Sequence, residues 1–229
     1  MTSLSETDKL SILASLPKDV RDLVLENKLI IGGGYIRAKI AREKPSDIDL
    51  FGTSIEVLQE CARQLASDRQ ARLYKTDNAI TVLTVGRIPI QFITKWLYTD
   101  AQKLIESFDF TIAQACIHPS DGQWVSVCAD EFYADLAAKR LVYTRPIREE
   151  APGGSIMRVR KFLARGYWIQ SDALAGVIAR LVNKIRWDEI RNENEIQREE
   201  WTSKIIKALL REVDPLTVID GVEINEDQD

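Results

Sequence analysis

The sequence predicts an α+β fold in two parts: a mixed sheet flanked by helices in residues 1–145, and an all-helical subdomain in residues 146–229. Short stretches that alternate between polar and apolar residues are typical of strands, and they occur in the first part. Apolar residues at helical spacing separate these stretches and continue after Arg145, where no strand pattern is convincing. A chain of 229 residues can bury a core as one domain or as two small ones.

A helix and a strand are predicted to precede a run of glycines. Residues 16–28 predict a leading helix, because Pro17 suits a first helical turn and the apolar residues that follow recur at helical spacing. Residues 28–31, KLII, predict a short buried strand that runs directly into the glycines at 32–34.

A short helix and a second strand follow the glycines. Residues 35–43 predict a helix that ends before Pro45, because the position before a proline disfavours helical backbone. Residues 47–52, DIDLFG, alternate as a strand does, which places Asp47 and Asp49 together on one face and apolar residues on the other.

The rest of the first part continues this mixture of elements. Residues 54–68 predict a helix, and residues 79–85 and 88–94 predict a β-hairpin that lies beside the aspartate strand. Residues 100–115 have helical spacing, and residues 121–127 predict a turn that leads into a short strand.

The second part is predicted to consist of helices at residues 155–169, 172–185 and 198–213, followed by an acidic tail at 223–229 that is expected to fray. Four tryptophans occur singly in apolar patterns and are predicted to pack in the core. They are Trp124, Trp168, Trp187 and Trp201.

The composition predicts a globular cytoplasmic protein. No apolar run approaches the length of a membrane span, and the N-terminus MTSLSETDKL lacks the features of a secretory signal, so no membrane partner is expected. The formal net charge of −4 disfavours nonspecific binding to polyanions by the molecule as a whole. Cys61, Cys116 and Cys128 are expected to be buried reduced thiols, because their spacing and the single histidine do not suit a zinc site.

The aspartate strand carries the strongest functional signal. Asp47 and Asp49 project from one strand face, so their carboxylates are close enough to share a divalent cation, whereas without a cation their negative charges repel. Mg²⁺ prefers such oxygen ligands, and triphosphate oxygens can complete its coordination. The preceding glycines allow backbone N–H groups to approach phosphates. The alternative is a pair of solvent-exposed aspartates without a ligand.

Three competing motifs fail on the same residues. A dinucleotide-binding G-x-G-x-x-G fails because Arg37 stands where the third glycine belongs, and a Walker A loop lacks its Gly-Lys-Ser/Thr. A calcium-binding loop that starts at Asp47 would need an oxygen ligand and a glutamate at the positions of Phe51 and Leu58.

Glycines, a helix and then Asp-x-Asp on a strand resemble the nucleotidyltransferase superfamily that includes DNA polymerase beta. Within it, the chain is most similar to the head and neck of bacterial-type CCA-adding enzymes and poly(A) polymerases. Four segments carry this resemblance in order: GGYIRA at 33–38, FDFTIAQA at 108–115, FYADLAAKRL at 132–141 and MRVRKFLARGY at 157–167.

The resemblance implies a nucleotidyltransferase-type sheet, a helical neck and a site that uses Mg²⁺ or Mn²⁺. It implies that Asp47 and Asp49 are catalytic and bind the metal, with Asp49 also aligning the attacking hydroxyl. The residues expected to bind the nucleotide are Gly33, Gly34, Arg37, Asp109, Arg158 and Lys161.

A basic helix face extends this predicted site. Arg158, Lys161 and Arg165 are spaced so that they share one face, which can hold a triphosphate or a nucleic-acid backbone. For these three residues the alternative is a solvated basic face. For Arg37 the alternative is a surface ion pair, and for Asp109 it is a buried helix cap or salt bridge.

The chain departs from the family at several positions. Residues 151–155, APGGS, replace the motif that reads the incoming base, so no base preference is carried over. Gln91 stands where a carboxylate is often expected on the neighbouring strand, and Ala38 replaces the aspartate of the glycine turn. The residues after 170 are expected to be too few for the long helical body and tail that grip tRNA in that family.

The favoured function is metal-dependent transfer of an NMP from an NTP to an acceptor hydroxyl, with an RNA 3′ end as the favoured acceptor. A catalytically degenerate subunit that binds a nucleotide or RNA is the main alternative, which Gln91 and Ala38 favour and the retained aspartates disfavour. A toxin-like transferase that modifies tRNA or a protein is a third hypothesis. The oligomeric state does not follow from the sequence.

Overall fold

The computed structural model describes residues 1–147, 153–185, 187 and 195–211. The chain forms two compact units, Met1–Ala138 and Lys139–Asp229. The acidic tail at 223–229 and the first two residues of the APGGS segment lie outside the described residues. The assignment of residues 1–145 as a catalytic head and of 146–229 as a neck stays a prediction.

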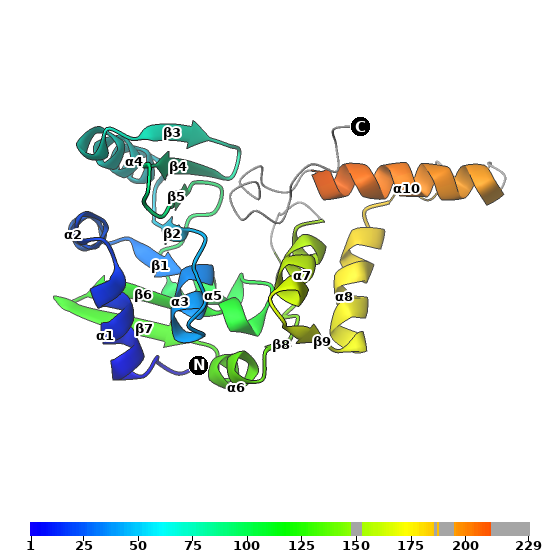
Figure 1. The fold of residues 1–229 in the computed structure, drawn as a ribbon, viewed down its shortest axis with the longest axis horizontal. Helices are drawn as coiled ribbons and strands as arrows, with labels where there is room; N and C mark the ends of the chain where they lie inside the picture. Colours follow the sequence, from blue (N-terminus) through cyan, green and yellow to red (C-terminus); the bar gives the residue numbers. More distant parts are fainter. Residues whose placement is uncertain (148–152, 186, 188–194, 212–229) are drawn as a thin grey trace. The chain divides into compact units, whose positions relative to one another are not determined.

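The first unit is built on one mixed sheet. Its strands are β1 (Ile30–Gly32), β2 (Ile48–Phe51), β3 (Arg72–Lys75), β4 (Ala79–Leu83), β5 (Ile90–Ile93), β6 (Ala115–Ser120) and β7 (Gln123–Cys128). Within the described residues they form a seven-stranded sheet in the order β3-β4-β5-β2-β1-β6-β7 (Figure 1). β2 and β5 are parallel, and the other neighbouring strands are antiparallel.

Helices flank this sheet. They are α1 (Glu6–Ser15), α2 (Lys18–Asn27), α3 (Gly34–Ile40), α4 (Ile55–Arg69), α5 (Ala101–Glu106), the 3₁₀ helix η1 (Thr111–Ala113) and α6 (Phe132–Ala137). Side-chain caps define where some of them begin: the Ser54 hydroxyl accepts a hydrogen bond from the Val57 backbone N–H at the start of α4. The α+β class with a mixed sheet and flanking helices is therefore confirmed.

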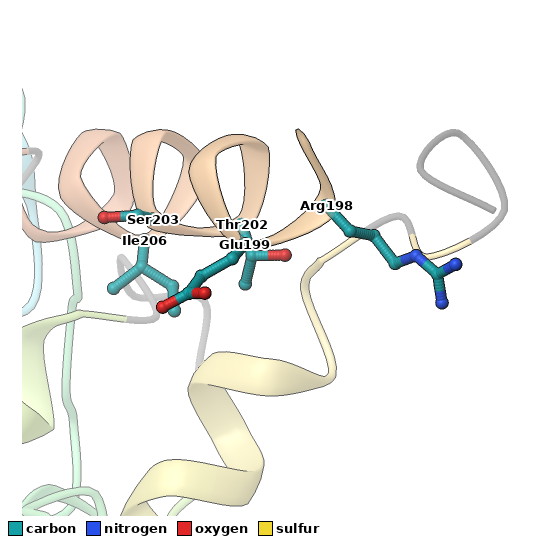
Figure 2. A pocket seen from close by; sticks show the side chains of 5 residues that line it. All are labelled: Arg198, Glu199, Thr202, Ser203 and Ile206. Carbon is teal, nitrogen blue, oxygen red and sulfur yellow. The ribbon is translucent and has the colours of Figure 1, made fainter. Parts of the chain in front are cut away.

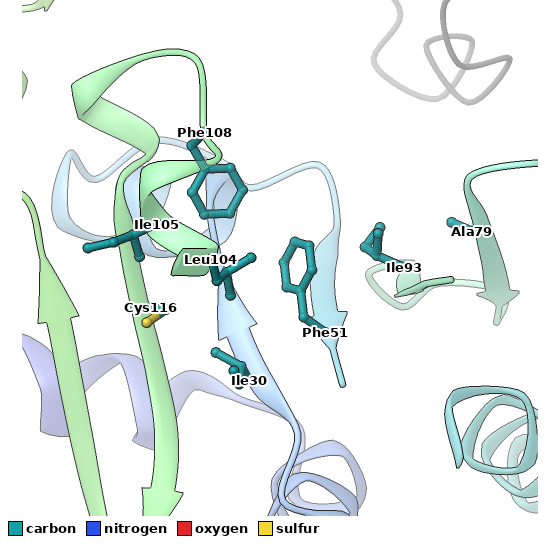
Figure 3. Packing of buried hydrophobic residues seen from close by; sticks show 8 residues of the cluster. All are labelled: Ile30, Phe51, Ala79, Ile93, Leu104, Ile105, Phe108 and Cys116. Atoms are coloured by element: carbon teal, nitrogen blue, oxygen red, sulfur yellow. The ribbon is translucent and has the colours of Figure 1, made fainter. Parts of the chain in front are cut away.

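The two faces of the sheet have different environments at β2. Ile48 and Leu50 are completely buried on one face. On the other face, Phe51 belongs to a hydrophobic cluster with Ile30 of β1 and with Leu104 and other residues of α5 (Figure 3). Asp49 lies on this second face, two residues before Phe51, because side chains alternate along a strand. The candidate site therefore borders a packed apolar cluster.

Most predicted elements of the first unit are confirmed, and one is partly wrong. α2, β1, α3, β2, α4 and the β4–β5 hairpin lie where the sequence predicts them, and β5 pairs with β2 as expected. The helical prediction for residues 100–115 is wrong after Glu106, where α5 ends and a turn, η1 and the start of β6 follow.

Among the elements of the first unit, α1, β3, β6 and α6 were not predicted. All four residues of β3 are exposed, so this edge strand has no apolar alternation to detect. β6 contains Pro119, which is unusual within a strand.

The second unit contains the three predicted helices. They are α7 (Gly154–Ala164), α8 (Ser171–Val182) and α10 (Glu195–Arg211). It also contains a short parallel pair of strands, β8 (Arg140–Leu141) and β9 (Trp168–Ile169), so the expectation of no strand after Arg145 is wrong at β9. α7 ends because Gly166 adopts a φ of 81° and the Tyr167 N–H turns back to the Phe162 carbonyl.

The prediction that the tryptophans pack in the core is wrong for three of them. Trp168, Trp187 and Trp201 are 44%, 42% and 52% exposed. The buried residues of the second unit include Phe162 of α7 and Val177 of α8, whereas no residue of α10 between Glu195 and Ala208 is buried. Among the described residues, no helix combines the length with the apolar character that a membrane crossing needs.

Candidate active site

The glycine turn brings the backbone against the aspartate strand. Gly33, between β1 and α3, adopts φ 72° and ψ −131°, a conformation open to glycine and strained for other residues. Its N–H donates a hydrogen bond to the Ala115 carbonyl at 3.0 Å. A Cβ atom on residue 33 would lie 3.8 Å from Asp49 Oδ2 and 3.4 Å from the Phe108 ring. The turn and the carboxylate therefore form one local structure.

Gly34 faces a different environment. It is the first residue of α3, and a Cβ atom at this position would meet no atom within 4 Å. One side of the turn is therefore tightly packed, and the other is open.

The paired aspartates flank a completely buried residue. Asp49 lies in β2 and Asp47 immediately precedes Ile48, whose N–H donates to the Pro89 carbonyl at 3.0 Å. Both aspartates are partly buried, whereas Ile48 is 0% exposed. The alternation between acidic and buried apolar residues thus follows the predicted pattern.

The strand beside Asp49 supplies an amide in place of a carboxylate. Gln91 of β5 is the register partner of Asp49, and Gly32 of β1 is its partner on the other side. Among the described residues, no group of three or more His, Cys, Asp or Glu side chains is arranged to hold a metal ion. The two aspartates nevertheless offer the hard oxygen donors that Mg²⁺ and Mn²⁺ favour, and substrate oxygens would have to supply further ligands. The donor set fits a cation that is bound together with a phosphate-bearing substrate.

Arg37 is buried near the glycine turn. It is 3% exposed, and its Nη1 lies 2.6 Å from Oε2 of Glu43. Its backbone N–H donates to the Gly33 carbonyl at 3.4 Å, within the first turn of α3. The ion-pair alternative is therefore present in the structure, although it is buried and not on the surface. The role of Arg37 in nucleotide binding stays a prediction.

Asp109 lies in the turn between α5 and η1, and it is only 2% exposed. Its neighbour Phe108 packs edge-on against Phe51, with ring centroids 5.8 Å apart (Figure 3). The Gln114 amide donates a hydrogen bond to the Phe108 carbonyl at 3.4 Å. The backbone at Asp109 is thus held by its neighbours, and its role toward a nucleotide stays a prediction.

A buried polar pair, which the sequence reasoning did not single out, supports this turn. The Thr111 hydroxyl of η1 donates a short hydrogen bond to Oδ2 of Asp135 in α6, and Asp135 is 0% exposed. The two residues lie in the segments at 108–115 and 132–141 that carry the family resemblance. Because both segments match the same family, the sequence could have indicated that they pack against each other.

The predicted basic face lies in the second unit. Arg158 and Lys161 belong to α7, and Arg165 follows its last residue. All three are partly buried, whereas Arg160 on another side of the helix is exposed. Their similar exposure agrees with a common face, and their binding roles stay predictions.

A pocket in the second unit lies along α10 (Figure 2). Glu199, Thr202 and Ile206 project from the same side of the helix, and Arg198 and Ser203 complete the lining. None of the predicted site residues is among these five.

The cysteines have no features of a nucleophile. Cys61, Cys116 and Cys128 are free and buried, as predicted. Burial raises the pKa of Cys116 to about 12 and that of Cys61 to about 11, so both remain neutral thiols near pH 7.

The first unit of the chain matches a known protein family. The sequence profile of a family described as Gabija anti-defense 2 matches residues 4–139, more than half of the chain. A curated relative named Gabija anti-defense 2, from Bacillus phage SPbetaL7, is 22% identical over 177 residues. The match covers 75% of this chain and 42% of the relative, so the chain spans less than half of that protein's length.

Solved structures of CCA-adding enzymes have a similar fold. A Thermotoga maritima CCA-adding enzyme in complex with tRNA has a TM-score of 0.56 and is 17% identical, over 96% of this chain and 55% of that one. A CCA-adding enzyme in complex with CTP has a TM-score of 0.55 and 17% identity, over 86% and 54% of the two chains. A complex with ATP has a TM-score of 0.56 and 18% identity, over 96% and 53%.

These comparisons confirm the predicted likeness to CCA-adding enzymes at the level of the fold. The matched residues 4–139 include the glycine turn, both aspartates and Asp109. The chain is a member of the Gabija anti-defense 2 family, and it has the nucleotidyltransferase fold of CCA-adding enzymes.

Proposed function

We propose that this protein is a metal-dependent nucleotidyltransferase that transfers an NMP from an NTP to an acceptor hydroxyl. The observation that carries the proposal is the position of Gly33 against the Asp49 carboxylate, with Asp47 two residues away, on the fold of CCA-adding enzymes. A packed glycine turn beside two carboxylates supplies a close approach for phosphates and oxygen donors for a cation.

Asp47 and Asp49 would hold Mg²⁺ or Mn²⁺. The bound ion would neutralise charge on the triphosphate and favour attack at the α-phosphorus. Asp49 would also align the acceptor hydroxyl, whose oxygen forms a bond to the α-phosphorus as the bond to the bridging oxygen breaks. Pyrophosphate leaves and the hydroxyl proton passes to water. The protein would act by positioning and charge neutralisation, without a covalent intermediate.

Other residues would bind the substrates. Gly34 has open space beside it, which supports contact with a phosphate. We assign Gly33, Arg37, Asp109, Arg158 and Lys161 to the nucleotide as well, and the face formed by Arg158, Lys161 and Arg165 to a nucleic-acid backbone.

An RNA 3′ end is the acceptor we favour, because the solved neighbours include a complex with tRNA and complexes with CTP and ATP. The absence of carboxylates and arginine from the APGGS segment supports weak discrimination among bases. We expect the reaction to take place in the cytoplasm.

Family membership supports an anti-defense role as the biological context. We propose that the chain acts against Gabija defense, and that nucleotidyl transfer to an RNA or a protein of the host is the means. This combines the enzyme hypothesis with the toxin-like alternative, because the chemistry is shared and only the acceptor differs.

The test is a labelling experiment. Purified protein is incubated with each α-labelled NTP, with Mg²⁺ or Mn²⁺, and with total RNA or cell lysate, and the labelled macromolecule is identified. Asp49→Asn should abolish labelling while keeping the wild-type melting temperature or raising it. Asp121→Asn is a matched control, because Asp121 is an exposed residue with a φ of 49°, which asparagine tolerates. Full labelling by Asp49→Asn would refute the proposal.

A further inference from the structure

A row of side chains crosses the sheet at the candidate site. Strand register places Thr81 of β4 beside Gln91 of β5, Gln91 beside Asp49 of β2, and Asp49 beside Gly32 of β1. Register partners on adjacent strands project from the same sheet face, with about 4.8 Å between strands. Gln91 is therefore the immediate lateral neighbour of Asp49, and Thr81 is one strand farther away.

Gln91 and Thr81 are buried polar residues in otherwise apolar strands. Gln91 is 6% exposed, and it lies between Ile90 and Phe92, both completely buried. Thr81 is 0% exposed, and its hydroxyl has no hydrogen-bond partner. Within the described part of the chain, the Gln91 amide makes no side-chain hydrogen bond either, but it is not among the fully buried unsatisfied groups and keeps some access to solvent. The row thus contains one buried unsatisfied hydroxyl, at Thr81, and one accessible amide without a protein partner, at Gln91.

The Gln91 amide is open to a ligand. A polar group that has no partner in the protein is satisfied by water or by a ligand, because a lost partner costs about 1–3 kcal/mol. Gln91 stands next to the Asp49 carboxylate, which we assign to the metal, so a substrate bound with that metal can supply the partner.

The chemistry of the Gln91 amide indicates which kind of ligand atom it would bind. Two carboxylates already give the site two negative charges, and a triphosphate adds more. A third carboxylate on β5 would repel phosphate oxygens unless another cation intervened. The glutamine Nε2 group carries two N–H donors and no charge, so it can donate to an anionic oxygen. Its side chain is also one methylene longer than that of Asp49, so the amide can reach beyond the carboxylate.

We propose that Gln91 is a positioning residue that donates a hydrogen bond from its Nε2 amide to a phosphoryl oxygen of the bound NTP, beside Asp49. This inference rests on the proposed function. It assigns Gln91 to the substrate, so the residue does not act as a neutral substitute for a metal-binding carboxylate.

The test compares stability with nucleotide affinity. Calorimetry measures the Kd of a non-hydrolysable NTP analogue with Mg²⁺, and thermal unfolding measures Tm. Gln91→Met keeps the length of the side chain and removes the donor, and Gln91→Leu is a second variant of different shape. For both we expect Tm to stay the same or rise, and Kd to increase about tenfold, the factor that a lost hydrogen bond to a charged group produces.

Two further variants sharpen the result. Thr81→Val removes the buried unsatisfied hydroxyl, one strand farther from Asp49, and should keep or raise Tm without changing Kd by more than about twofold. Gln91→Glu should weaken NTP binding, because it replaces a donor with a negative charge.

Unchanged affinity for the NTP analogue in Gln91→Met and Gln91→Leu would overturn the inference. Tighter binding of the analogue by Gln91→Glu would also overturn it, because it would indicate that residue 91 is a metal ligand. Loss of folding in both apolar variants would show a structural role and overturn it as well. A wild-type protein that binds no NTP would refute the proposed function together with this inference. NTP binding by the wild type with no effect of Gln91 would refute this inference alone.

Discussion

Gly33 and Asp49 lie against each other: Oδ2 of Asp49 is 3.8 Å from the point that a Cβ atom on residue 33 would occupy. Gly33 directly follows β1, whose last residue, Gly32, is the register partner of Asp49 in β2. The glycine turn and the aspartate strand are therefore a single unit, and a change in one is expected to affect the other.

Gly33→Ala is expected to destabilise the protein. The φ of 72° with ψ of −131° is strained for alanine, whereas the new Cβ atom would only make van der Waals contact with the Phe108 ring at 3.4 Å. We expect a loss of about 1–3 kcal/mol in the free energy of unfolding, measured by urea denaturation. Gly34→Ala is the matched control, because it lies in a helix with open space beside it and should be neutral or stabilising. Equal losses in both variants would contradict the structural account of Gly33.

Mg²⁺ is expected to stabilise the protein by binding to the aspartate pair. A ligand that binds only the folded state adds about 2.7 kcal/mol at a hundredfold excess over its Kd. Thermal unfolding should therefore show a Tm that rises with Mg²⁺ and falls again when EDTA removes it. In Asp47→Asn and Asp49→Asn this dependence should be lost, whereas in Asp121→Asn it should persist. A Mg²⁺ effect that survives in both site variants would locate the ion elsewhere.

Loss of the Thr111 hydroxyl is expected to weaken the packing of η1 on α6. Thr111→Val keeps the shape of the side chain but removes the donor to the buried Asp135 carboxylate, and should cost about 1–3 kcal/mol. The same substitution at Thr81, whose buried hydroxyl has no partner, should cost nothing. Chemical denaturation of the two variants tests this contrast, and an equal effect would mean that the Thr111–Asp135 bond contributes no stability.

Asp19 is expected to make stability depend on pH in acid. Hydrogen bonds from the Arg69 guanidinium, at 2.7 and 2.8 Å, hold the pKa of Asp19 below its ordinary value of 3.8. Because the folded-state pKa is the lower one, this contribution is fully present well above pH 3.8 and is lost as the pH falls through the folded-state pKa.

The measurement is the unfolding free energy of wild type and Asp19→Asn as a function of pH. At neutral pH the variant should be about 2 kcal/mol less stable, because the Arg69 side chain is only 2% exposed and loses its counterion. The difference should shrink below pH 3.8. Asp22→Asn is the control, since its ion pair with Lys18 is exposed and should contribute less than about 0.5 kcal/mol. A difference that does not change with pH would exclude the ionic mechanism.

Glu43→Gln tests whether Arg37 is structural. The buried Arg37 guanidinium would lose the charge of its 2.6 Å partner, and we expect a cost of about 2–3 kcal/mol. If Arg37 binds phosphate as well, Arg37→Met should weaken NTP binding more than Glu43→Gln does, as measured by calorimetry at a temperature where both variants are folded. Equal binding by the two variants would leave Arg37 with a structural role alone.

The sequence determined the local parts of the fold and of the candidate site. The alternation around Asp49 predicted β2, the glycines predicted the turn at Gly33, and helical spacing predicted α4 and α7. The hairpin beside β2 also followed from pattern and turn residues. These features depend on residues a few positions apart, and side-chain periodicity records them directly.

Only the tertiary structure decided what surrounds those parts. In the tertiary structure, β6 pairs with β1 and the buried Arg37 forms an ion pair with Glu43. Thr111 forms a hydrogen bond with Asp135, and Trp201 is exposed. Each of these outcomes depends on which distant segment packs against a residue, and local spacing carries no record of that choice. The family resemblance had already placed Gln91 on the strand beside the aspartates, and the structure added its pairing with Asp49, because strand register is fixed between segments about forty residues apart.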